Sequence, residues 1–132
     1  MYIGKVIQFL KFIFHISTFF LIIISLYPGS LLGYMFYGNF HTQPNLVENP
    51  FGSSINHTIY YLYLTLLGSF LYLRSNKFQK LVYGLFFLSI ILEVLQLIVP
   101  NRAFELYDLL GNFVGVLVGY FLVKIYLYFR KI

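Results

Sequence analysis

The sequence has no cysteine and no tryptophan, and only 10% of its 132 residues are charged. The absence of cysteine excludes disulfide bonds, thiolate nucleophiles and cysteine-ligated metal sites. A soluble domain has about 25% charged residues, whereas here 60% of the residues are apolar and the mean hydropathy is +0.81. A soluble fold of this length cannot bury so many apolar side chains, so the surplus must face lipid. We therefore expect an integral membrane protein.

Four apolar segments each approach the roughly 20 residues that a helix needs to cross ~30 Å of hydrocarbon. They cover about residues 12–27, 55–73, 81–99 and 107–127, and the alternative for the first is a start near Val6 with the Lys11 ammonium group extended toward water. Backbone groups in lipid must bond within their own segment, which favours helices, and strand-like alternation is absent. The sequence predicts an all-α polytopic membrane protein, in which one transmembrane domain over residues 1–132 forms a four-helix bundle.

The distribution of basic residues predicts the orientation of this bundle. Eight of the nine lysines and arginines fall near the N-terminus, between the second and third segments, or near the C-terminus, and Arg102 falls on the other side. Because cytoplasmic loops are rich in Lys and Arg, we expect an N-in, C-in topology. This topology accounts for the net charge of +5, and no basic face indicates nucleic-acid binding. Residues 28–54, the outer segment, then form either an interfacial loop or a cover over the outer end.

Polar side chains inside the apolar segments converge at one depth. Glu93 lies within the third segment, where a central charge costs roughly 2.5–3.5 kcal/mol on translocon scales. It precedes Pro100 by seven residues, which puts it ~10 Å below the outer end of that helix. Gln96 shares its face one turn later, and Arg102 follows in the next turn.

The neighbouring segments carry polar groups to the same depth, because Asp108 and Asn112 open the fourth segment and His57 and Tyr61 share a face at the start of the second. We therefore expect one outward-facing cluster of ligand-binding residues. Its members are His57, Tyr61, Glu93, Gln96, Arg102, Asp108 and Asn112. The candidates for a catalytic role are His57, Glu93 and Asp108.

Structural roles remain open for the same residues. Asp108 suits a helix N-cap, and Asn112 and Gln96 suit hydrogen bonds between helices. Arg102 suits a contact with a lipid phosphate or with Glu105. No ligand spacing in the sequence selects a metal, so we expect neither a metal nor a cofactor.

Glycine recurs every four residues along the fourth segment, at Gly111, Gly115 and Gly119. Such a series lets two helix backbones approach closely. We expect this glycine face to pack against a neighbouring helix, and it also offers a surface for a protein partner.

The order and spacing of the polar residues resemble the VanZ-like family of small bacterial membrane proteins. That family has a His four residues before a Tyr at a helix start, then Glu-x-x-Gln, an Arg in the following turn, and Asp-x-x-x-Asn-x-x-Gly-x-x-x-Gly. The matching residues are His57, Tyr61, Glu93, Gln96, Arg102, Asp108, Asn112, Gly115 and Gly119. Members often have a Lys or Asp just ahead of the His, where this chain has Ile55 and Asn56. The resemblance implies a multi-pass protein of the bacterial cytoplasmic (inner) membrane, with links to the cell envelope and to resistance to the glycopeptide antibiotic teicoplanin.

Three functions remain open. In the first, the protein binds an envelope lipid or lipid-linked sugar, with Arg102 and His57 holding a phosphate and Glu93 bonding sugar hydroxyls. In the second, it is an intramembrane enzyme with His57 as base or nucleophile and Asp108 or Glu93 as the acid or orienting group. In the third, it is an accessory subunit whose polar cluster only holds the helices together. We expect a membrane lipid or lipid-linked envelope precursor as the partner.

Overall fold

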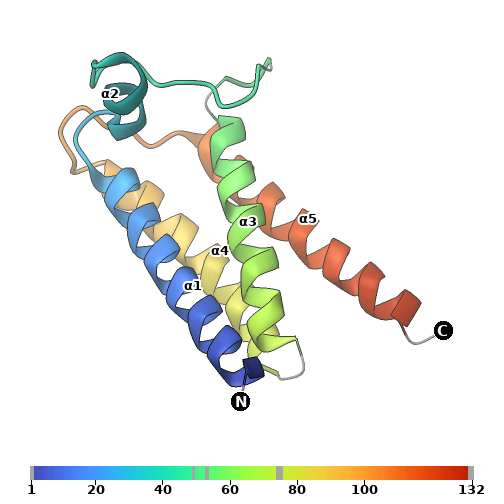
Figure 1. The fold of residues 1–132 in the computed structure, drawn as a ribbon. Coiled ribbons are helices and arrows are strands. Elements are labelled where there is room, and N and C mark those ends of the chain that lie inside the picture. Colours follow the sequence, from blue (N-terminus) through green and yellow to red (C-terminus); the bar gives the residue numbers. More distant parts are fainter. Residues whose placement is uncertain (1, 49, 53, 74–75, 131–132) are drawn as a thin grey trace.

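A computed structural model describes residues 2–48, 50–52, 54–73 and 76–130 of the chain (Figure 1). It contains the helices α1 (Tyr2–Leu26), α2 (Leu31–Tyr37), α3 (Ser54–Tyr72), α4 (Lys77–Gln96) and α5 (Leu106–Arg130). No strand occurs in these four ranges, so the all-α prediction is confirmed. Arg74 and Lys131, two of the basic residues used for the orientation, lie outside the described residues.

Among the described residues, three helices are long and apolar enough to cross a membrane, namely α1 from Ile3 onward, α4 and α5. Their length and composition support a membrane protein. Helix α3 is not among these three, and it carries polar side chains such as Asn56 and His57. It packs against α1, α4 and α5, and its buried polar residues therefore face protein rather than lipid. The four-helix count and the N-in, C-in topology remain predictions.

The long helices alternate in direction, so that both chain termini lie at one end of the bundle and α2 lies at the other (Figure 1). Lys5 is in the first turn of α1, Lys77 begins α4 and Arg130 ends α5, which puts all three at the end with the termini. At the opposite end, α4 finishes where α3 and α5 begin. The polar residues near these three helix ends are thereby brought to one place.

Helix boundaries differ from the sequence prediction by three residues or more at four places, which include the start of α4 at Lys77 rather than near residue 81 and the end of α5 at Arg130 rather than near residue 127. Helix α1 begins at Tyr2 rather than near residue 12, because Lys5 and Lys11 continue the helix beyond its apolar part and can extend their ammonium groups toward water. Helix α4 ends at Gln96 rather than near residue 99, because Pro100 disfavours helical backbone in the residue before it. Glu93 is therefore one turn, about 4.5 Å, from the end of its helix rather than two.

The outer segment contains the short helix α2, which the sequence did not predict. The Ser30 side chain accepts a hydrogen bond from the Gly33 amide at 2.9 Å, and Gly38 ends the helix in the left-handed conformation with φ 66°. The Tyr34 ring stacks on the Phe40 ring with centroids 4.3 Å apart. The first half of the outer segment is therefore folded rather than extended.

The glycine face of α5 packs against α3 within the same chain. A Cβ atom on Gly111 would lie 2.7 Å from the Ser54 carbonyl oxygen, and one on Gly115 would collide with the Thr58 carbonyl oxygen. A Cβ atom on Gly119 would lie 2.8 Å from the Thr65 Cβ. The glycines therefore allow α3 and α5 to approach closely, and this approach sets the geometry of the site between them.

Candidate functional site

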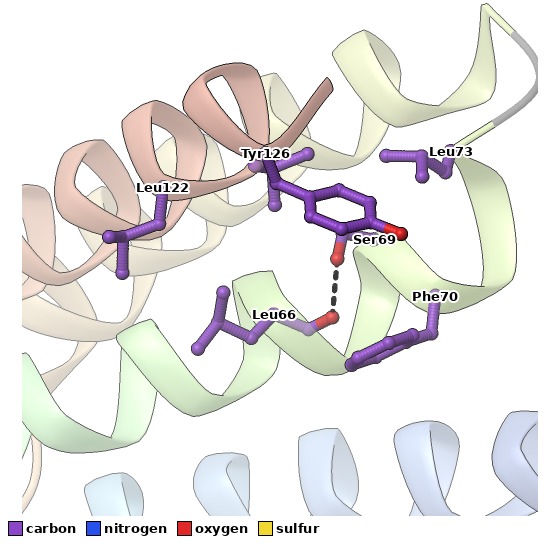
Figure 2. A pocket seen from close by; sticks show the side chains of 7 residues that line it. Leu66, Ser69, Phe70, Leu73, Leu122 and Tyr126 are labelled. Carbon is purple, nitrogen blue, oxygen red and sulfur yellow. Dashed lines mark hydrogen bonds between the residues drawn. The ribbon is translucent and has the colours of Figure 1, made fainter. Parts of the chain in front are cut away.

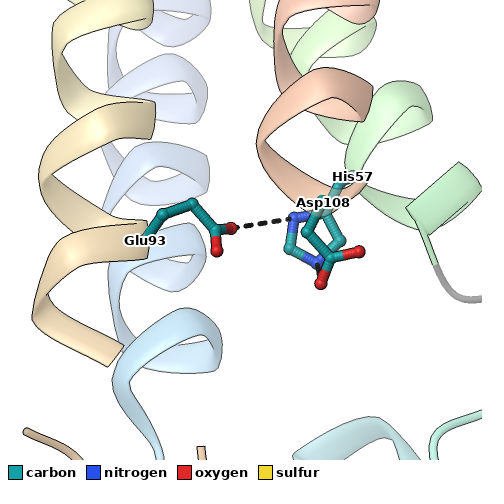
Figure 3. Close-up of side chains that lie close together, drawn as sticks. All are labelled: His57, Glu93 and Asp108. Carbon is teal, nitrogen blue, oxygen red and sulfur yellow. Dashed lines mark ion pairs between the residues drawn. The ribbon is translucent and has the colours of Figure 1, made fainter. Parts of the chain in front are cut away.

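His57 is the centre of a buried polar cluster formed by three helices (Figure 3). Its Nε2 atom lies 3.3 Å from Asp108 Oδ2 on α5, and its Nδ1 atom lies 3.9 Å from Glu93 Oε1 on α4. The Nδ1 atom is also 3.1 Å from Asn112 Oδ1. The Glu93 side chain is 1% exposed and that of Asp108 is 9% exposed, whereas the imidazole is 15% exposed. His57 is thus the member of the cluster most accessible from outside.

The two carboxylates of the cluster differ in the number of hydrogen-bond partners of their oxygen atoms. Asp108 Oδ1 accepts a hydrogen bond from the Ser54 hydroxyl at 2.6 Å, and its other oxygen faces His57. Glu93 Oε2 has no hydrogen-bond partner among the described residues. The buried Tyr61 hydroxyl also lacks a partner there and interacts electrostatically with Glu93. A buried carboxylate oxygen without a partner is costly, so Glu93 retains the capacity to bind something.

Asp108 does not act as the helix N-cap that its position suggested. Helix α5 begins at Leu106, so Asp108 lies inside the first turn, and its side chain bonds Ser54 and His57 of α3. The carboxylate nevertheless lies near the positive end of the α5 dipole, where a negative charge is favoured. Glu93 lies near the C-terminal end of α4, where a negative charge is disfavoured.

Gln96 and Arg102 bind the end of α1 rather than the cluster. Gln96 Nε2 donates to the Ser25 carbonyl oxygen at 3.0 Å. Arg102 donates from Nε to Tyr27 O at 3.1 Å and from Nη2 to Ile24 O at 2.6 Å. The last carbonyl groups of a helix lack partners within it, so these donors satisfy them and attach the α4–α5 connection to α1.

Arg102 still contributes a charge near the site. Partial burial lowers the pKa of its guanidinium from the ordinary value, and the carboxylates of Asp108, Glu93 and Glu105 act against that shift. The sequence suggested a direct contact of Arg102 with a lipid phosphate or with Glu105. The hydrogen bonds of its side chain go instead to the end of α1.

Asn56 and Ser54 are site residues that the sequence reasoning did not select. Asn56 Nδ2 donates to Pro44 O at 2.8 Å, and its Oδ1 accepts from the Leu46 amide at 3.0 Å. Asn56 thereby holds the outer segment against α3 next to His57. The signal for both residues was their position in the first turn of a helix, beside His57.

A cavity of about 180 Å³ lies next to His57. Its lining combines apolar side chains of α1, α2 and the outer segment with polar groups of α3 and of Gln43 in the outer segment: Leu21, Ile24, Leu32, Gln43, Leu46, Asn56, His57 and Tyr60. A second cavity, of about 400 Å³, lies between α3 and α5 and includes Ser54 and Thr58 in its lining. The polar cluster therefore adjoins one cavity through His57 and the other through Ser54.

A further cavity, of about 310 Å³, lies between α3 and α5 toward the end with the termini (Figure 2). Leu66, Phe70, Leu73 and Leu122 make most of its lining apolar. The Ser69 hydroxyl in this cavity is already bonded to the Leu66 carbonyl oxygen at 2.6 Å. This cavity is a gap between diverging apolar helices, and we assign no chemistry to it.

The fold and the cluster define a helical membrane protein with a buried histidine–carboxylate site near one end of its bundle. The model of the VanZ/LLP1 family matches residues 12–127, and the chain belongs to this family. The resemblance noted in the sequence is therefore confirmed. No curated protein and no solved structure matches the chain.

Proposed function

We propose that this protein spans the bacterial cytoplasmic membrane with four helices, N- and C-termini inside, and binds or modifies a lipid or lipid-linked sugar of the cell envelope. The polar cluster would recognise the head group at the outer end of the bundle. A change in the pool of such envelope molecules is the route by which the protein would affect sensitivity to a glycopeptide such as teicoplanin.

The observation that supports this proposal most strongly is that His57 belongs both to the polar cluster and to the lining of a cavity. Its imidazole belongs to the buried cluster with Glu93 and Asp108, and it also lines the cavity of about 180 Å³. Leu21 and Ile24 of α1 form an apolar part of the same cavity. An amphiphile needs this combination, in which its polar part meets ionisable groups and its chain meets aliphatic side chains.

The size of the cavities limits what the site can take. Pockets that enclose a drug-sized ligand measure roughly 300–1,000 Å³, so the cavity beside His57 holds only part of a lipid. The second cavity, between α3 and α5, has Tyr107 and Leu110 in its lining. We assign the head group to the cluster and a chain to one of these two cavities.

The chemistry of the cluster suits both binding and modification. His57 and Asp108 have the contact that a general base and its orienting carboxylate require, with 3.3 Å between Nε2 and Oδ2. Asn112 and Glu93 offer further groups for head-group hydroxyls or phosphate. Incubation of the purified protein with the bound lipid class, followed by product analysis, separates binding from turnover.

The test is the lipid content of the full chain, purified from bacterial membranes in a mild detergent and analysed by mass spectrometry. Leu46→Trp places a large ring in the cavity beside His57, because Leu46 belongs to its lining. Leu97→Trp is the matched control, since Leu97 is 64% exposed and lines neither of the two cavities next to the cluster. We expect one lipid class to be enriched in the wild type and the control and to fall severalfold in Leu46→Trp. A lipid profile that equals the bulk membrane in all three proteins would contradict the proposal.

A second candidate function is that of an accessory subunit without a ligand. The observation in its favour is that Gln96 and Arg102 bond backbone carbonyl groups of α1, which is a purely structural use of polar side chains. In that case the cluster would only hold the helices together. Unchanged lipid content in Leu46→Trp, together with loss of folding when the cluster is altered, would favour this reading.

A further inference from the structure

The polar cluster contains more negative than positive charge in direct contact. Glu93 and Asp108 are two buried carboxylates, and the imidazole of His57 is the one basic group that contacts both among the described residues. Even a doubly protonated imidazole neutralises only one of them. The hydrogen bonds of Arg102 go to carbonyl groups of α1 instead. Buried charges are normally paired or bound to a metal, yet no guanidinium or ammonium group among the described residues forms an ion pair with either carboxylate.

One carboxylate oxygen of the cluster is free to bind a positive ion. Glu93 Oε2 is buried and has no hydrogen-bond partner in the described part of the chain. His57, Glu93 and Asp108 each offer one ligand atom, and these atoms lie within 4.8 Å of one another. Three helices thus present one nitrogen and two carboxylate oxygens to a common point.

We propose that His57, Glu93 and Asp108 bind a divalent transition-metal ion of the zinc type, with His57 as a neutral imidazole. A charge of +2 balances the two carboxylates. A mixed set of one imidazole nitrogen and two carboxylate oxygens suits zinc better than calcium or magnesium, which prefer oxygen ligands.

One pair of ligand atoms in the cluster already has the spacing of such a site. Ligand atoms about 2.1 Å from a tetrahedral zinc ion lie about 3.4 Å from each other. His57 Nε2 and Asp108 Oδ2 are already 3.3 Å apart. Glu93 Oε1 lies 3.9 Å from the other ring nitrogen, Nδ1, so the Glu93 side chain has to move toward Asp108 to share an ion bound at Nε2.

The surroundings of the three ligands are those that a metal site requires. With His57 Nε2 on the metal, its Nδ1–H donates to Asn112 Oδ1, 3.1 Å away, and this fixes the ring. The Ser54 hydroxyl orients the Asp108 carboxylate through its bond of 2.6 Å to Oδ1. Three protein ligands leave a fourth position open, and the partly exposed face of His57 connects it to the cavity of about 180 Å³. This inference requires only the cluster and does not depend on whether the cavity holds a lipid.

The test is metal binding by the full chain, purified without a histidine tag, stripped with EDTA and titrated with Zn²⁺ by calorimetry. We expect about one ion per chain, and at least roughly tenfold weaker binding in Glu93→Gln and in Asp108→Asn. His41→Gln is the control, because His41 is exposed and lies in the outer segment, and its binding should match the wild type. Ser54→Ala keeps all three ligands and should weaken binding by roughly 10–100-fold.

Circular dichroism of each metal-free variant establishes that it is folded, and Co²⁺ absorption in the visible range reports the ligand set without any assay of activity. The proposal is overturned if the wild type binds no stoichiometric zinc, or if the ligand variants bind it as well as the wild type does. Lipid content is measured on the same stripped samples. Lipid without zinc would overturn the metal site alone, and zinc without lipid would overturn the lipid site alone.

Discussion

Of the three glycines on the α5 face, Gly115 leaves the least room for a side chain against α3, and Gly115→Ala should be destabilising. The added Cβ would collide with the Thr58 carbonyl oxygen and lie 2.9 Å from the Leu62 amide nitrogen and 3.1 Å from the Tyr61 Cβ. Two of these three atoms belong to the backbone, so a helix must shift to make room. Overpacking of this kind costs about 1–3 kcal/mol. The higher helix propensity of alanine offsets about 1 kcal/mol of that cost, so we expect a net loss of up to about 2 kcal/mol relative to the wild type, and of about 1–3 kcal/mol relative to a Gly→Ala change without a clash.

The matched control is Gly84→Ala in α4, where an added Cβ meets nothing within 4 Å. This variant should be as stable as the wild type or slightly more stable. Both variants and the wild type are unfolded in the same detergent, with helix content followed by circular dichroism. If Gly115→Ala unfolds within about 0.5 kcal/mol of Gly84→Ala, the spread expected for substitutions without a packing effect, the close α3–α5 contact is wrong.

Three further predictions concern topology, the α1 contact and the outer segment. Reporter fusions after Ser75 and at Ile132 should read cytoplasmic and a fusion at Asn45 should read external, whereas an external signal at Ser75 would contradict the four-helix topology. Arg102→Gln should lower the free energy of unfolding by about 1–3 kcal/mol, because it removes charge-assisted hydrogen bonds to α1, and unchanged stability would argue against that contact. Asn56→Ala should speed proteolysis of the outer segment, because both groups of its side-chain amide bond that segment, and cleavage at the wild-type rate would show that the bonds do not hold it.

The sequence was sufficient to predict the all-α class and a gathering of polar residues from three helices near one end of the bundle. The chain has more apolar residues than a soluble core of its length can bury, which indicates a surface in contact with lipid. The fixed rise of a helix placed Glu93, Asp108 and His57 near the same end of three helices. The structure brings these three residues into contact distance. The glycine spacing likewise predicted close packing, and Gly115 lies against α3.

The sequence could not predict which groups the individual side chains bond. Gln96 and Arg102 follow the spacing of the cluster but bond the end of α1, because the free carbonyl groups there become neighbours only in the folded bundle. The contact between Ser54 and Asp108 joins residues 54 positions apart and depends on the same packing. Spacing along one helix predicts a shared face, and it does not predict which neighbouring group fills that face.

Helix α2 carried a local signal that the hydropathy pattern obscured. Ser30 is a favourable N-cap residue, and Gly38 is a favourable left-handed residue just past the end of a helix. The seven residues between them are too few to cross a membrane, so a search for membrane spans passes over them. Capping residues would have identified the helix, whereas its position next to the bundle end depends on contacts distant in the sequence.

The central claim, that the cluster serves a ligand and not only the fold, is tested most directly by the lipid content and thermal stability of Glu93→Gln measured on the same preparation. The substitution keeps the shape of the side chain and removes its charge. His57 remains 3.3 Å from Asp108, so no cation is left unpaired, and we expect a stability change of about 1 kcal/mol or less. The account predicts a folded, monodisperse protein that has lost the bound lipid. A variant that retains the lipid at the wild-type level, or one destabilised by the roughly 3–5 kcal/mol typical of a broken buried ion pair, would contradict it.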